Sequence, residues 1–180
     1  MSKVLNLKKE SLKIAVKKAF RNWSYRFKED FGFATTLALV SNETLAFLAQ
    51  GRDKGAFYLY DLIMNLVGFG SAFEFNELNS RKKIIMIDRY LLLLDQIRFE
   101  CMKRLGWLVS YPGERIPLVE LVLAFDRLTP GIQAGIPVLS PECKDYDLFC
   151  ALTPIEREIF IRKLIPRAIT EIEAMRETPD

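Results

Sequence analysis

The side chains best placed for acid or ligand chemistry are carboxylates in the segment 80–107. Asp88 and Asp95 are seven residues apart, so on a helix they share a face, and Arg98 follows Asp95 at the three-residue spacing of an ion pair. An isolated buried charge destabilises a fold, so carboxylates on a buried face need partners. Two interpretations stay open: internal salt bridges between helices, which we favour, and a ligand or catalytic acid site.

Other catalytic chemistry finds little support in the composition. The chain has no histidine, which excludes Ser–His–Asp and Cys–His arrangements, zinc sites that need histidine, and histidine pH switches. The three cysteines, Cys101, Cys143 and Cys150, contain no C-x-x-C pair and are interpreted as small buried hydrophobic residues. We therefore expect no metal and no cofactor, and we lean against an enzyme.

The cysteine count also bears on location. An odd, low number of cysteines and the lack of a recognisable secretory leader predict a reducing, cytoplasmic environment. Two long apolar stretches, 31–49 and 55–73, are long enough for a membrane span, but each carries one acid, Glu43 or Asp61. A mid-bilayer acid costs about 2.5–3.5 kcal/mol on insertion scales, so we predict no transmembrane span.

A basic stripe marks the N-terminal helix. Lys9, Lys13, Lys17 and Arg21 step by four residues, and the first 30 residues hold nine basic against three acidic side chains. We favour a solvated helix face and keep two alternatives, a polyanion such as nucleic acid and an anionic membrane surface. Nucleic acid is not expected, because the whole chain carries only +3 and shows no recognised nucleic-acid fold.

Two short motifs cover only a few residues. The segment Leu152–Ile159 resembles the opening of the helix-turn-helix domain in LuxR-type response regulators, but the sequence continues as one helix through Pro166 without a recognition helix. Gly68 and Gly70 lack the third small residue of a dinucleotide-binding loop, because position 73 is Phe. Neither motif predicts DNA or nucleotide binding.

Helical periodicity positions all of these groups. Half of the residues are hydrophobic, and they recur at three- and four-residue spacing. We predict an all-α, single-domain bundle of six to eight helices over residues 1–180, with a central, largely buried helix near 80–107. The expected helices are 8–30, 43–50, 56–67, 80–107, 117–128, 141–152 and one from 154 onward, with a long ordered loop at 129–141. The buried stripe expected on the central helix is Ile84, Ile87, Leu91, Leu94, Met102 and Leu105.

Three function hypotheses follow. The first is a non-catalytic helical binding or assembly module that self-associates as a homo-oligomer or binds a helical protein partner, because the apolar content is high. The second is a sensor or binding protein for a small apolar ligand, with a pocket inside the bundle. Its candidate lining is Phe57, Tyr60, Met64, Phe69, Phe73, Tyr90 and Phe99. The third is polyanion binding through the basic N-terminal helix.

Overall fold

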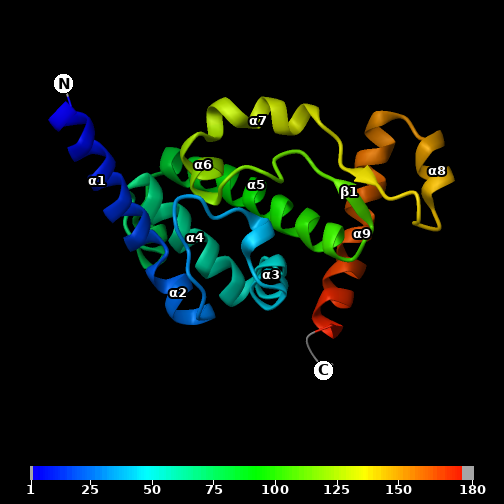
Figure 1. Ribbon diagram of the computed structural model, residues 1–180, viewed down its shortest axis with the longest axis horizontal. Helices are drawn as coiled ribbons and strands as arrows, with labels where there is room; N and C mark the ends of the chain where they lie inside the picture. The colour runs from blue at the N-terminus through cyan, green and yellow to red at the C-terminus, as the bar shows by residue number, and fades with distance from the viewer. Residues whose placement is uncertain (1, 176–180) are drawn as a thin grey trace.

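The protein is built almost entirely from helices (Figure 1). The structure, a computed structural model, describes residues 2–175 and the side chains of residues 10–175. Its α-helices are α1 (Ser2–Ala19), α2 (Arg21–Phe27), α3 (Asn42–Ala49), α4 (Asp53–Val67), α5 (Ser80–Arg104), α6 (Leu118–Leu123), α7 (Phe125–Ala134), α8 (Tyr146–Ala151) and α9 (Pro154–Ala174). Two 3-10 helices, η1 (Leu37–Leu39) and η2 (Ala72–Glu77), join them, and β1 (Leu108–Ser110) pairs antiparallel with β2 (Val138–Leu139). The all-α prediction is confirmed.

The described part of the chain holds nine α-helices rather than six to eight, because two predicted helices are interrupted. The stretch 8–30 is divided at Phe20 into α1 and α2, and the stretch 117–128 is divided at Ala124, where ψ turns to 22°. The predicted loop at 129–141 is wrong for its first half, since α7 continues through Pro130 to Ala134. Pro130 has no N–H to donate to the carbonyl of Asp126, but Asp126 is exposed, which makes the proline tolerable.

Helix α5 lies in the middle of the molecule and confirms the predicted central helix (Figure 1). It begins at the cap residue Asn79, whose side-chain oxygen accepts a hydrogen bond from the backbone N–H of Lys82 at 2.9 Å. It packs against α3, α4, α6 and α9 and against β1. The buried apolar positions along it are Met86, Tyr90, Leu93, Leu94, Ile97, Phe99, Cys101 and Met102.

The stripe expected on the first half of this helix is wrong. Ile84, Ile87 and Leu91 are 60%, 40% and 53% exposed. The inward face is the one through Met86, Tyr90 and Leu93 instead. Because the segment is apolar on both sides, its periodicity could not show which side meets the neighbouring helices.

Two acids in apolar surroundings are held by hydrogen bonds. Asp61 on α4, 1% exposed, accepts from the side-chain amides of Asn22 at 2.6 Å and Asn65 at 3.3 Å, and from the backbone N–H of Ala72 at 3.1 Å. Glu100 on α5 accepts from the Tyr111 hydroxyl at 2.8 Å and pairs with Arg104 at 3.0 Å. Paired in this way, both carboxylates can stay inside the fold.

A membrane-spanning element is absent from the described residues: none of their helices combines the length and the apolar character that crossing a bilayer requires.

The core consists of two clusters of buried side chains, and the half-buried residues Leu105 and Ile169 pack against both. The single-domain assignment stays a prediction.

The cysteines differ more than the sequence suggested. All three are free thiols, but only Cys101 is buried, while Cys143 is half-buried and Cys150 is exposed. The prediction that the cysteines are buried is therefore wrong for Cys150. It follows Phe149 on the short helix α8, where Phe149 takes the inward position.

These environments predict selective alkylation of the native protein. Burial raises the pKa of the Cys101 thiol to about 12, so the thiolate that reacts amounts to roughly 1 in 10,000 of the molecules at pH 8. With iodoacetamide at pH 8, peptide mass mapping should find Cys150 modified within minutes and Cys101 unmodified. Cys101 should react once denaturant is added, and equal native rates for the two thiols would contradict this packing.

Candidate functional site

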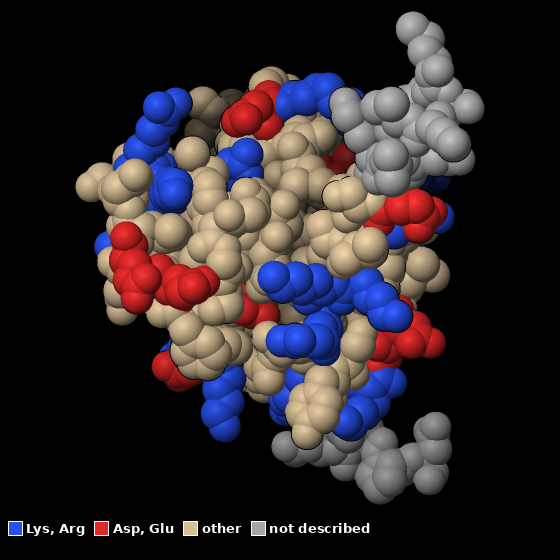
Figure 2. Space-filling view, turned by 90° about the vertical axis from the view of Figure 1, so that its left-hand side faces the viewer, with Lys and Arg blue, Asp and Glu red and all other residues tan. Residues whose placement is uncertain are grey.

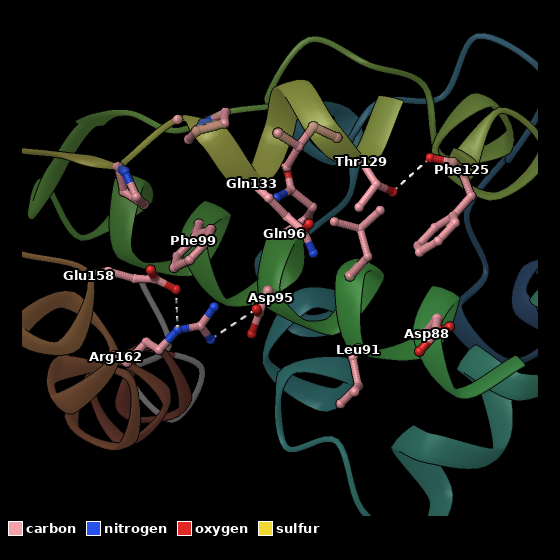
Figure 3. A pocket seen from close by; sticks show the side chains of 15 residues that line it. Asp88, Leu91, Asp95, Gln96, Phe99, Phe125, Thr129, Gln133, Glu158 and Arg162 are labelled. Carbon is pink, nitrogen blue, oxygen red and sulfur yellow. Dashed lines mark hydrogen bonds and ion pairs between the residues drawn. The ribbon is translucent and has the colours of Figure 1, made fainter. Parts of the chain in front are cut away.

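A cleft of about 620 Å³ lies between α5, α7 and the first half of α9, and we call it the central cleft (Figure 3). One wall is the side of α5 that carries Asp95, Gln96 and Phe99, and α7 lies across from it. The lining residues are Asp88, Leu91, Leu92, Asp95, Gln96, Phe99, Pro112, Phe125, Thr129, Ile132, Gln133, Gly135, Pro137, Glu158 and Arg162.

Helix α7 is held in place near both of its ends, by α5 at its start and by the loop after β1 beyond its end. Near its start, Arg89 of α5 donates to the carbonyl of Val122 at 3.1 Å, and its guanidinium lies 4.7 Å from the centre of the Phe125 ring. After its end, Gly135 approaches Pro112 so closely that a Cβ atom would lie 2.6 Å from the proline ring. These contacts fix the two ends of the wall opposite α5.

The charged groups of the central cleft gather mainly at the α9 end. Arg162 of α9 pairs with Asp95 of α5 at 2.9 Å and with Glu158 at 3.1 Å (Figure 3). Partial burial alone would lower the pKa of Arg162, but the two carboxylates outweigh it and raise the pKa, so the guanidinium stays charged. Asp88 is exposed at the other end and forms no ion pair with any described residue.

Gln96 occupies the middle of the central cleft (Figure 3). Its side chain projects from α5 toward α7, and the residue is only 1% exposed. Its oxygen Oε1 is buried and has no hydrogen-bond partner in the described part of the chain. Its amide nitrogen likewise donates to no other described residue. A buried amide oxygen without a partner is uncommon and costs stability.

Sequence reasoning identified part of this site. Asp88 and Asp95 share a helix face as predicted, and both line the central cleft. The expected partner Arg98 is elsewhere, because its guanidinium donates to the carbonyl of Ala49 at 3.0 Å, and Arg162 takes its place. The contribution of Gln96 was missed, since nothing in the sequence shows that a glutamine on an apolar face lacks partners.

The seven residues proposed as a ligand lining are spread over several places. Phe99 lines the central cleft. Tyr60 stacks on Tyr90 with ring centres 4.6 Å apart. The other four lie on or beside α4: Phe57 contacts Phe73 at 5.0 Å, Met64 is fully buried, and Phe69 lies under the Lys82 ammonium. The six residues other than Phe99 line neither this cleft nor the smaller one beside Trp107, and their ligand role stays a prediction.

The basic stripe is exposed as far as its side chains are described. Lys13, Lys17 and Arg21 face solvent, and Lys13 pairs with Glu10 at 2.9 Å. The side chain of Lys9 lies outside the described residues. Figure 2 views the end of the molecule formed by α1 and α2, where Lys and Arg side chains form a band with acidic side chains near its borders. Anion binding here stays a prediction.

Comparisons with protein-family models, with curated proteins and with solved structures find no match to this chain. In the part of the chain that the structure describes, no group of three or more His, Cys, Asp or Glu side chains is placed to hold a metal ion. The central cleft offers a ligand apolar walls, two side-chain amides (Gln96 and Gln133), the Thr129 hydroxyl, the Arg162 ion cluster and the exposed carboxylate of Asp88.

The unpaired amide predicts an unusual stability effect. Gln96→Met keeps a similar volume and removes the two unpaired polar atoms, so we expect the free energy of unfolding to rise by about 1–2 kcal/mol in urea denaturation. The matched change Gln133→Met, at an exposed position of the same cleft, should alter the free energy of unfolding by less than about 0.5 kcal/mol. A loss of more than about 1 kcal/mol in Gln96→Met would show that the amide is satisfied after all.

Proposed function

We propose that this protein is a non-catalytic binding module that holds a small ligand in the central cleft. The observation that carries the proposal is the cleft itself, whose volume of about 620 Å³ falls in the range of small-molecule sites. Its lining combines apolar side chains from α5 and α7, such as Leu92, Phe99 and Ile132, with a nearly equal share of polar side chains. A ligand could therefore make apolar contacts and hydrogen bonds in the same cleft.

The arrangement of charges favours binding over acid–base catalysis. Asp95 and Glu158 both direct an oxygen at the Arg162 guanidinium, so these oxygens are already engaged in ion pairs. Asp88 is exposed, and no described titratable group is in hydrogen-bond contact with it. General acid–base catalysis needs a group within reach of the reacting proton and tuned for its transfer.

Blocking the central cleft should abolish binding of a small apolar probe. We choose indole and follow its titration by backbone amide chemical shifts, expecting shifts to centre on the lining residues with a dissociation constant on the order of 1 mM. Gln133→Trp, from the wall formed by α7, should weaken this binding at least tenfold by filling the space.

The control is Ala134→Trp, which adds the same side chain at the next, exposed residue outside the lining. It should leave indole binding unchanged. Indole shifts located elsewhere on the molecule, or equal binding by both variants, would overturn the proposed function.

A second candidate is self-association through the outer face of α5, which we define as Ile84, Ile87 and Leu91. These three residues are 60%, 40% and 53% exposed and recur at helical spacing, so they form one apolar strip. A second copy of the chain that covers the strip would account for the high apolar content noted in the sequence. A reducing, cytoplasmic location also belongs to the proposal, and the three free thiols support it.

Charge placed on the outer face of α5 tests this second candidate. We expect the wild-type protein to show a dimer in sedimentation at about 50 μM, and the double variant Ile84→Lys, Ile87→Lys to be monomeric, because desolvating two ammonium groups opposes association. Ile155→Lys, at a 74% exposed position on α9, is the control and should still dimerise. A monomeric wild-type protein at that concentration would refute self-association.

A further inference from the structure

We infer that the ligand of the central cleft carries a neutral carboxamide-type group, with a hydrogen-bond donor beside an acceptor, which binds the Gln96 side-chain amide. The inference rests on the proposed function, because it assigns a ligand class to the same cleft. It starts from an unpaired buried polar group rather than from the volume of the site.

The place of Gln96 is built into the fold around it. The residue is 1% exposed, and its Oε1 atom lies so near Gly113 that a Cβ atom there would be 2.5 Å away. Gly113 has φ +91°, a conformation that favours glycine. The loop after β1 therefore passes the amide as bare backbone, and this leaves room for a polar side chain that bonds to nothing described around it.

An amide offers both a hydrogen-bond donor and a hydrogen-bond acceptor, and this selects the groups that can bind it. Gln96 has an NH₂ donor and a carbonyl acceptor on one planar group, and both are unpaired among the described residues. Rotation about its last torsion exchanges the two, so either can face the ligand. A carboxamide-type group matches both orientations, whereas a carboxylate only accepts hydrogen bonds and an ammonium group only donates them.

The fixed charges disfavour an anion. The ionisable lining residues are Asp88, Asp95, Glu158 and Arg162, a net charge of −2. The single cation, Arg162, is already engaged by two carboxylates at 2.9 Å and 3.1 Å. An anionic ligand would meet this negative field without a free cation in the cleft to offset it, and its desolvation would oppose binding.

The apolar walls favour a flat body on the ligand. Phe99 is 7% exposed and is supported from behind by Tyr111, whose ring centre lies 6.0 Å away. Leu92 and Ile132 add aliphatic surface on the two opposite walls. A ring bearing a carboxamide would contact these walls while its polar edge reaches Gln96.

Four probes that share one benzene ring separate the possibilities: benzamide, toluene, benzoate and benzamidine. Each is titrated by NMR against the wild-type protein, Gln96→Met, and the control Gln50→Met, which makes the same change at an exposed position outside the lining. Benzamide should bind the central cleft at least fivefold more tightly than toluene and tenfold more tightly than benzoate. Gln96→Met should remove the advantage over toluene, and Gln50→Met should preserve it.

Several results would overturn the inference. Toluene binding as tightly as benzamide would do so while leaving the proposed function intact. The same holds if benzamidine binds best and loses its advantage in Asp88→Asn rather than in Gln96→Met, because the recognised group would then be a cation. If none of the four probes shifts the lining residues but indole does, the inference alone is overturned. If indole also fails to shift them, the proposed function is overturned as well.

Discussion

The structure depends on the enclosure of α5. It gives four helices a common surface, because α3, α4, α6 and α9 all pack against α5. The helix also carries polar groups that must be satisfied inside the protein, and Glu100 is satisfied by Tyr111 and Arg104. The chain around α5 is thus constrained in two ways: it must cover apolar surface, and it must bring donors to buried acceptors. Gln96 is the one place on this helix where the second condition is left unmet by the described residues.

Much of the fold could be predicted from local signals. The cap at Thr153 with Glu156, the length of α5 and the short helix before α9 follow from residues close together in the sequence. The breaks inside helices could not be predicted from the sequence. Phe20 and Ala124, where helices are interrupted, are ordinary helix residues, so tertiary packing rather than local preference decides the bends there.

In the candidate site too, the features set by one helix could be predicted, and those set by packing between helices could not. That Asp88 and Asp95 share a face is a property of one helix and could be read from their spacing. The choice of Arg162 over Arg98 as the partner of Asp95 depends on where α9 docks, which no local pattern shows. The exposure of Ile84, Ile87 and Leu91 has the same origin, because an apolar residue on a two-sided apolar helix faces outward only where no neighbour arrives.

The carboxylate of Asp61 joins segments that are distant along the chain. It is reached by Asn22 from α2, by Asn65 from its own helix and by the backbone of Ala72 at the start of η2. These donors carry no charge, and none can be withdrawn without leaving an anion poorly solvated in the interior. The docking of α2 and the turn after α4 are consequently coupled energetically. They should open as a single cooperative unit, with their slowest amide hydrogens exchanging at one shared rate.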